Sequence, residues 1–250
     1  MRKSCRRTWV LARRNLTEIL RDPLGAVFLL AMPLLMEILF YFLFHGLTSQ
    51  FEINVLAPGI VVFSQAFLTL FSGLLISLDR GTSFLRRLYV SEARPHEFIC
   101  GYLLALLPVS LCQSILFFVV GGILDRSLWS TAIPAGVLAG AATSFFFVGC
   151  GILCGSLCGE KSIGGVSSAI IVGQSVLSGM WFPTEGLSGG FLTLMKVLPF
   201  KNATDLVRCA VNGCDDPVAG ILRPLAVVAA YTVAVFAAAT LVFRHKSRGG

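Results

Sequence analysis

The sequence is poor in charged residues, which make up only 13% of its 250 positions, whereas apolar residues make up 56%. A soluble domain needs fewer apolar residues to fill its core and carries more charge on its surface. The apolar residues also come in blocks of about twenty, the length at which a helix rising about 1.5 Å per residue crosses a hydrocarbon core. The scarcity of charge therefore argues against a soluble protein and predicts an integral membrane protein built from helices.

The sequence also has little that would support catalysis or nucleotide binding. Its three histidines, His45, His96 and His245, are scattered over both sides of the predicted membrane region and form no catalytic cluster. The phosphate-binding loop G-x-x-x-x-G-K-[ST] is absent. Its nearest approach, GSLCGEKS at 155–162, has Glu160 before the lysine, where a carboxylate would repel phosphate. We expect no enzymatic activity and no bound ATP or magnesium in this chain.

Six apolar blocks predict six membrane-spanning helices, so the expected fold class is an all-α integral membrane protein. Residues 24–243 form its transmembrane domain, and residues 244–250 follow as a short tail. The predicted spans are 24–44, 56–78, 98–124, 131–157, 163–182 and 221–243.

Residues 1–23 are basic and amphipathic and do not have the pattern of a cleavable signal. On a helical wheel one face is apolar and the opposite face is charged. We expect such a helix to lie in the headgroup plane and to bind membrane lipid. Pro23 restricts Asp22 away from helical angles, which should end this helix before the first span. The apolar face holds Trp9, Ala12, Leu16, Ile19 and Leu20, and the charged face holds Arg7, Arg14, Glu18 and Arg21.

Positive charge is distributed unevenly. With six alternating spans, fifteen of the 20 lysines and arginines share a side with the N-terminus. Because cytoplasmic loops retain positive charge during insertion, we expect both termini in the cytoplasm and the protein in the cell membrane. The net charge of +7 then matches anionic inner-leaflet lipid, and we expect no nucleic-acid partner. The five cations of the other side are Arg126, Lys196, Lys201, Arg208 and Arg223.

Three stretches of the sequence follow one another in a characteristic order. They are RRNLTEILRDPLGAVFLLAMPLL at 13–35, DRGTSFLRRLYVSEARPHEFICGYLLA at 79–105, and GMWFPTEGL at 179–187 followed by VLPFKNATDLVR at 197–208. With the six spans, this order resembles the membrane-spanning subunit of type 2 ABC exporters, the ABC-2 type permeases, over nearly the whole chain. The resemblance implies an export permease whose separate ATPase subunits bind ATP and Mg²⁺. Since the spans show no internal duplication, two copies, or this copy and a sister permease, would each form half of the path.

The resemblance makes the cytoplasmic segment 79–97 the element that couples the permease to the ATPase. Its leucines and tyrosine can form the apolar side of a short helix that its arginines border, and such a helix would dock in a groove of the ATPase. The alternative is that the arginines only enforce topology. The predicted coupling residues are Arg80, Gly81, Thr82, Leu85, Arg86, Arg87, Leu88, Tyr89 and Glu92.

Three polar residues inside the predicted spans are candidates for lining the translocation path: Glu37, Gln65 and Gln174. A carboxylate at mid-span costs about 2.5 to 3.5 kcal/mol, so Glu37 should face protein or water. Either it lines the path and recognises a cationic or hydroxyl-rich substrate, or it is a protonated, hydrogen-bonded packing residue. For the glutamines, the alternative to a ligand role is hydrogen bonding between helices.

The segment 183–217 is too long for an ordinary turn and carries alternating apolar patches. We expect it to dip back toward the membrane as two short helices, and the resemblance implies a re-entrant gate at the outer exit. Gly186, Gly189 and Gly190 would supply its bends. Residues 187–190 read LSGG, as in the signature of ABC ATPases, but no ATP is available on this side of the membrane. We therefore interpret this match as chance.

Of the eight cysteines, only Cys209 and Cys214 fall in this outer segment, and they would form a disulfide if that face is oxidising. The fourth span carries small residues every four positions, which predicts close helix packing. Three cysteines on one straight helical face cannot surround an ion, so we expect no metal site. These residues are Gly136, Gly140, Gly151, Gly155 and Gly159, alongside Cys150, Cys154 and Cys158.

The main alternative function is a secondary transporter or channel that is not driven by ATP. The hydropathy and Glu37 fit this class, but such proteins usually have internal repeats or more intramembrane charge. A membrane-embedded enzyme would need clustered catalytic groups. A membrane scaffold without transport activity also fits the hydropathy.

Overall fold

The computed structural model describes residues 2–81, 95–184 and 187–248, which form helices joined by short connections, with no strand among them. The long helices are α1 (Arg2–Leu20), α2 (Pro23–Phe44), α3 (Ile53–Gly81), α5 (Pro95–Leu124), α6 (Ile133–Leu157), α7 (Glu160–Leu177) and α10 (Arg223–Arg248). The shorter elements are η1 (Ser49–Phe51), η2 (Arg126–Leu128), α8 (Gly190–Val197), α9 (Pro199–Asn212) and the π-helical turn η3 (Val218–Leu222).

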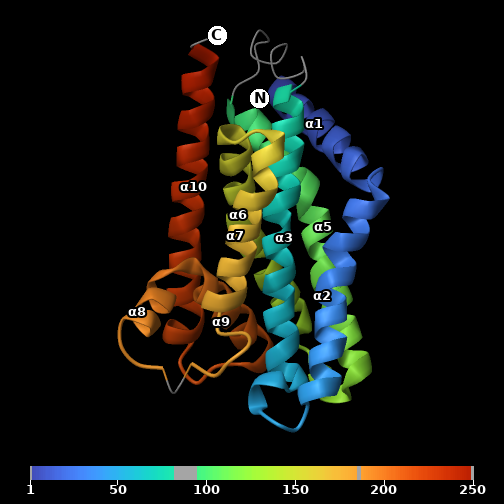
Figure 1. Ribbon diagram of the computed structural model, residues 1–250, viewed down its shortest axis with the longest axis vertical. Helices are drawn as coiled ribbons and strands as arrows, with labels where there is room; N and C mark the ends of the chain where they lie inside the picture. Colours follow the sequence, from blue (N-terminus) through green and yellow to red (C-terminus); the bar gives the residue numbers. More distant parts are fainter. Residues whose placement is uncertain (1, 82–94, 185–186, 249–250) are drawn as a thin grey trace.

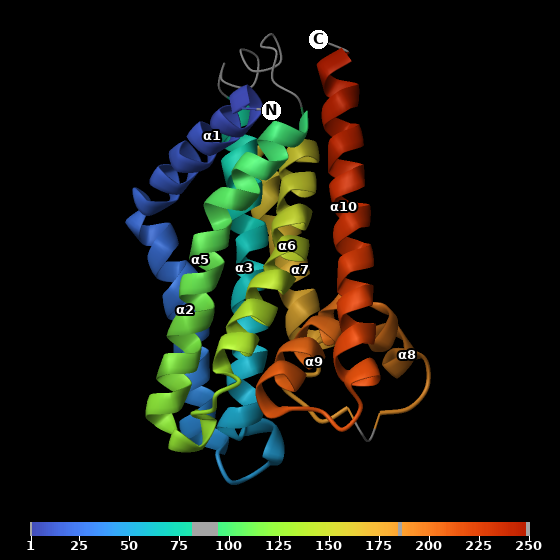
Figure 2. The ribbon, with the colours of Figure 1, turned by 180° about the vertical axis from the view of Figure 1, so that it is seen from behind.

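The long helices stand side by side in one bundle, and both chain ends lie at the same end of it (Figure 1). We call this the termini end. The opposite end holds α8 and α9, and we call it the α9 end (Figures 1 and 2). Successive long helices from α2 onward run in alternating directions between the two ends, as the sequence predicts.

Five of the described helices are long and apolar enough to cross a membrane: α2, α3, α5, α6 and α10. α7 runs beside α3 in the same bundle (Figure 1) but is not among them, since it has 18 residues and begins with Glu160 and Lys161. It ends at Leu177 instead of continuing to 182, because Gly179 turns the chain with a φ of 67°. The all-helical membrane fold is thus confirmed with five candidate spans, and the sixth span stays a prediction.

α1 crosses the termini end obliquely and packs against α5 (Figure 2). Asp22, before Pro23, has non-helical angles, and its carboxylate accepts a hydrogen bond from the Gly25 N–H at 3.0 Å, which caps α2. The contact with α5 covers only part of the predicted apolar face of α1. Trp9 and Leu20, at one edge of that face, remain 66% and 68% exposed.

α3 is the central helix, since 83% of its apolar stretch Ile53–Arg80 is buried inside the bundle. The corresponding shares are 17% for Val27–Phe44 of α2 and 11% for Val218–Phe243, most of which is α10. α6 approaches it closely because both helices have glycine at the crossing. A Cβ on Gly155 would lie 2.5 Å from the carbonyl oxygen of Gly73, so no larger residue fits. Gly159 has no neighbour within 4 Å and lies beyond the end of α6, so it takes no part in this packing.

Candidate functional site

The last turn of α3 is joined to two neighbouring helices through Asp79. Its carboxylate, only 2% exposed, accepts hydrogen bonds from Arg14 at 3.1 and 2.5 Å and from the Tyr102 hydroxyl at 2.5 Å. Arg14 also pairs with Glu18 at 3.2 Å. Burial disfavours the charge of the Arg14 guanidinium, but the hydrogen bond and charge of Asp79 outweigh it and raise the pKa of Arg14. One buried carboxylate therefore ties α3 to α1 and α5.

The next residue, Arg80, ties α3 to α6. Its Nη1 donates hydrogen bonds to the carbonyl oxygens of Gly155, Ser156 and Cys158 at 3.0, 2.6 and 3.0 Å. The last carbonyls of a helix have no partners within it, and a positive charge there also interacts favourably with the helix dipole. Arg80 thus caps the end of α6. We call Arg14, Asp79, Arg80 and Tyr102 the α3-end clamp.

The predicted coupling segment starts directly at this clamp. Arg80 and Gly81 end α3, and Pro95 begins α5. Near the start of α5, the buried Glu97 accepts a hydrogen bond from the Ser4 hydroxyl of α1. The chain therefore leaves and re-enters the bundle at two points that are both tied to α1. The other predicted coupling residues, Thr82, Leu85, Arg86, Arg87, Leu88, Tyr89 and Glu92, lie outside the described residues, so their role stays a prediction.

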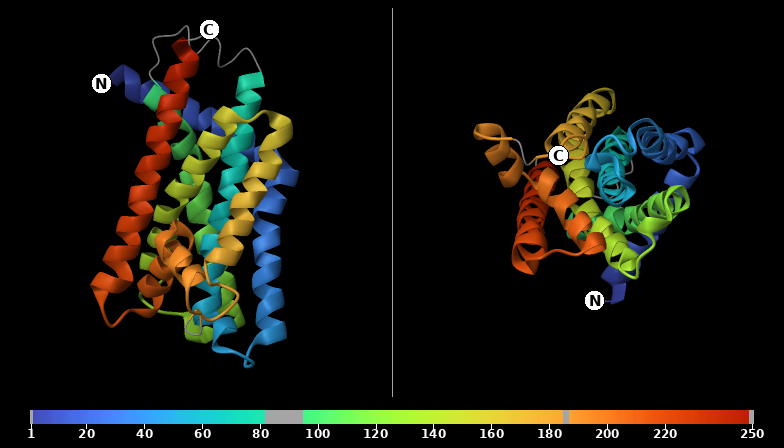
Figure 3. Two further views of the ribbon diagram at one scale, coloured as in Figure 1. Left: turned by 60° about the vertical axis from the view of Figure 1, so that its left-hand side comes forward. Right: turned by 90° about the horizontal axis from the view of Figure 1, so that it is seen from below.

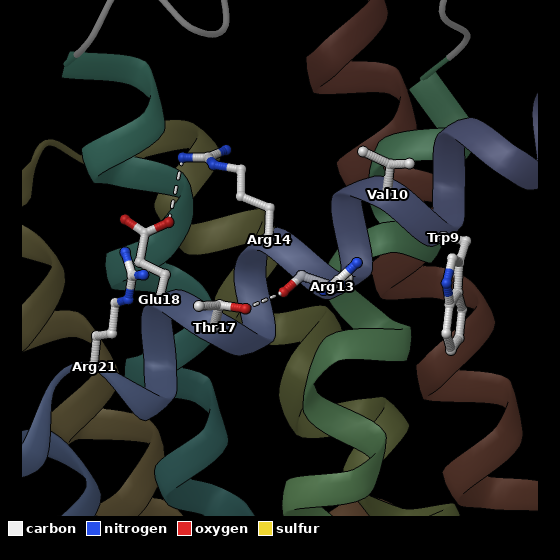
Figure 4. Close-up of a pocket in the computed structure, with 7 residues that line it drawn as sticks. All are labelled: Trp9, Val10, Arg13, Arg14, Thr17, Glu18 and Arg21. Atoms are coloured by element: carbon white, nitrogen blue, oxygen red, sulfur yellow. Dashed lines mark hydrogen bonds and ion pairs between the residues drawn. The ribbon is translucent and has the colours of Figure 1, made fainter.

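A cavity of about 670 Å³ runs along the exposed side of α1, next to the clamp. Figure 4 shows that all seven residues around it come from this helix, with Trp9 and Val10 toward one end and Glu18 and Arg21 toward the other. Apolar and cationic side chains side by side suit lipid headgroups and the adjoining acyl chains. Lipid binding by α1 stays a prediction that this surface supports.

Glu37 is buried between α2 and α5, with 0% exposure. Gly121 of α5 makes room for it, since a Cβ there would lie 3.1 Å from Glu37 Oε1, with Ala57 and Leu128 also close. Neither carboxylate oxygen has a hydrogen-bond partner among the residues that the structure describes. Within one chain Glu37 is thus closed off from solvent, and its surroundings favour the packing role, although without the hydrogen bond expected for it; a role in the path stays a prediction.

The two candidate glutamines join helices to each other. Gln65 of α3 donates to the Ser110 carbonyl at 3.3 Å and to the Ser114 hydroxyl at 3.1 Å, both in α5. Gln174 of α7 donates to the Thr204 hydroxyl of α9 at 3.2 Å. Both side chains are fully buried in the chain. These contacts favour the interhelical alternative, and a role in the path stays a prediction.

At the α9 end, the segment between α7 and α10 forms two short helices, α8 and α9, as the sequence predicts. Gly189 precedes α8 with a φ of 83°, a conformation that favours glycine, and Gly190 is the first residue of α8. Gly186 lies outside the described residues. A bend therefore falls at Gly189, while re-entry into the membrane and gating stay predictions.

Arg208 fixes α9 to the rest of the bundle, a role that the sequence analysis missed. Its buried guanidinium donates to the carbonyl oxygens of Val55 at 3.3 Å and Gly179 at 3.4 Å. Burial lowers the pKa of Arg208, and the nearby charge of Asp205 offsets this only in part. The cation thus connects α9, the first turn of α3 and the turn after α7.

Cys209 and Cys214 form a disulfide at the end of α9, with their Cα atoms 5.3 Å apart, a spacing typical of such bonds. Gly220 packs directly on this bond, since a Cβ there would lie 2.8 Å from Cys214 Cβ. Oxidation in the cell stays a prediction. It is tested by thiol alkylation of the denatured protein, in which reductant should expose two further thiols.

The bundle with its five apolar helices defines a multi-pass α-helical membrane protein. Residues 6–211 match the family described as ABC-2 type transporter. Because the match covers most of the chain, the protein belongs to this family, and the resemblance found in the sequence is confirmed. Membership supports a membrane transporter permease that works with ABC ATPase partners in general. No curated protein matches the chain significantly.

The sequence contained only a partial signal for the clamp. An acidic residue at the end of a span needs a partner, so Asp79 could have indicated a cation nearby, although the sequence analysis did not draw this conclusion. The partner, Arg14, is 65 residues away along the chain and belongs to a helix that was expected to lie in the headgroup plane. Tyr102 carried no signal at all, since a tyrosine near the end of a span is common.

Proposed function

We propose that this chain is the membrane-spanning permease subunit of an ATP-driven ABC exporter. Family membership and the broken phosphate-loop motif at 155–162 support this assignment. Separate ABC ATPase subunits would bind ATP and Mg²⁺ and hydrolyse the ATP, while this chain itself performs no catalysis.

The observation that carries the proposal is the α3-end clamp. Helices α1, α5 and α6 are all bonded to the last turn of α3, at the point where the coupling segment begins. A force applied to residues 82–94 by an ATPase would therefore reach four helices together. A segment whose arginines only enforced topology would not require this rigid attachment.

In this proposal the termini end faces the cytoplasm, because most of the lysines and arginines fall in its segments. α7 serves as the sixth span, and α8 and α9 form a re-entrant gate at the outer exit. The weakly buried helices α2 and α10 leave apolar faces for lipid and for a second copy or sister permease. Because Glu37, Gln65 and Gln174 are buried within one chain, they would reach the path only if the helices around them moved apart during transport.

Site-directed cross-linking tests the coupling. In a chain otherwise free of cysteine, Arg87→Cys is co-expressed with an ABC ATPase that copurifies with the chain and treated with a bifunctional thiol reagent. We expect an adduct with the combined mass of permease and ATPase. Arg126→Cys, at the α9 end, is the matched control and should give none. Two outcomes would contradict the proposed coupling site. One is an adduct from Arg126→Cys but not from Arg87→Cys, and the other is the absence of any adduct although the two proteins copurify.

A further inference from the structure

A cavity of about 400 Å³ lies at the α9 end and is lined by residues of α8, α9 and the start of α10. Figure 3 shows these helices at the same end of the bundle. Three cations from three helices line it: Lys196 of α8, Lys201 of α9 and Arg223 of α10. Asp205, the one acidic side chain in this lining, pairs with Lys201 at 2.8 Å. Neither Lys196 nor Arg223 forms an ion pair with any described residue. The lining therefore has a net charge of two positive.

The convergence of these cations is specific to this cavity. Of the five lysines and arginines that the sequence places on this side, three line it, whereas Arg126 and Arg208 do not. The turn between α8 and α9 is held by Asn202, whose amide donates to the carbonyl oxygens of Lys196 at 3.0 Å and Leu198 at 2.7 Å. Holding like charges close together costs free energy, and a bound anion would remove that cost.

The surroundings of the cavity are apolar on the side that would face lipid. Leu192, Ala219 and Pro224 complete part of its wall. α8 exposes Phe191, Leu194 and Val197, three residues apart on one helical face, at 40%, 47% and 57%. The candidate span that contains most of α10 begins at Val218, in the turn η3, so the cavity sits at the end of this span, which is the level of lipid headgroups.

We propose that this cavity binds the phosphate group of an anionic phospholipid. Lysine and arginine donate strong, charge-assisted hydrogen bonds to phosphate oxygens, and the guanidinium of Arg223 matches two of them at once. The acyl chains would then run along the exposed apolar residues of α8 and α10. This site does not depend on coupling to an ATPase.

Native mass spectrometry of the purified full-length chain tests the proposal, with dioleoyl phosphatidylglycerol and dioleoyl phosphatidylcholine as probes. The double variant Lys196→Gln/Arg223→Gln should retain at least fivefold less phosphatidylglycerol than wild type and the same amount of phosphatidylcholine. The decisive comparison is between variants, because the basic residues of the termini end also attract anionic lipid. Arg126→Gln is the matched control, since it removes an exposed charge from the same end, and it should bind as wild type does.

Two further measurements complete the test. Asp205→Asn removes the offsetting carboxylate and should increase phosphatidylglycerol retention, a gain that damage to the fold would not produce. Titration with inorganic phosphate separates lipid from free anion. Phosphate binding that is lost in the double variant, with unchanged lipid retention, would overturn the assignment to a lipid. Equal phosphatidylglycerol retention by the double variant and Arg126→Gln would overturn the site itself.

Discussion

At the scale of single residues, two buried carboxylates have opposite surroundings. Asp79 accepts hydrogen bonds from a guanidinium and a phenol, whereas both oxygens of Glu37 have no partner among the described residues. A partnered carboxylate is stable as an anion, but an unpartnered one in apolar surroundings costs several kcal/mol. Asp79 is therefore suited to hold helices together as an ion, and Glu37 is suited to its site as a neutral acid.

We predict that the Arg14–Asp79 pair contributes to stability in a double-mutant cycle. Arg14→Gln and Asp79→Asn should each lower the free energy of unfolding by about 1 to 2 kcal/mol, with a coupling of about 1 kcal/mol, because Arg14 is partly exposed to solvent. Denaturation of the full-length chain in mixed micelles measures it. Arg13→Gln, an exposed neighbour, should change stability by less than about 0.5 kcal/mol. Additive effects of the two variants would show that the pair contributes nothing.

We predict that Glu37→Gln folds as stably as wild type, within about 1 kcal/mol, because the amide has nearly the same shape and brings no charge into surroundings that offer no partner for one. The melting temperature in detergent and the ATP turnover of the complex with its ATPase measure the two relevant properties. Both should be unchanged. A variant that folds normally but loses permease-dependent turnover would show instead that the charge of Glu37 is used.

At the scale of elements, the helices were largely predictable from the sequence and their contacts were not. The apolar blocks predicted five helices that the structure describes as candidate spans, and the proline at position 23 predicted the break between α1 and α2. The end of α7 at Leu177 was not predicted, because the apolar pattern continues through residues that the turn at Gly179 takes out of the helix. Periodicity reports which face is apolar, but it does not report which helix that face meets.

Two glycines inside helices, one in α6 and one in α7, allow a matched test of helix packing. Gly155→Ala should lower the melting temperature by several degrees, because its Cβ would meet the backbone of Gly73. Gly165→Ala adds the same atom inside α7, where no neighbour lies within 4 Å, and should not lower the melting temperature. The same loss in both variants would mean that α3 and α6 do not meet closely at Gly155.

At the scale of the whole molecule, one chain leaves α2 and α10 largely uncovered, while α3 is nearly enclosed. Such a bundle is stable around its central helix and incomplete at its edges. In the proposed function, these uncovered faces meet lipid and a second permease that completes the path. The candidate site was predictable only as a region, since the sequence placed coupling at 79–97 but not the partners of Asp79 and Arg80 on α1, α5 and α6.

The most direct measurement of the central claim is the ATP hydrolysis rate of the purified ABC ATPase, alone and in complex with this chain in lipid nanodiscs. We predict that the wild-type chain changes the rate severalfold and that Arg126→Glu does the same. Arg87→Glu, in the coupling segment, should return the rate to that of the ATPase alone. A rate that is the same with and without the wild-type chain, or that Arg87→Glu leaves at the wild-type level, would contradict the account.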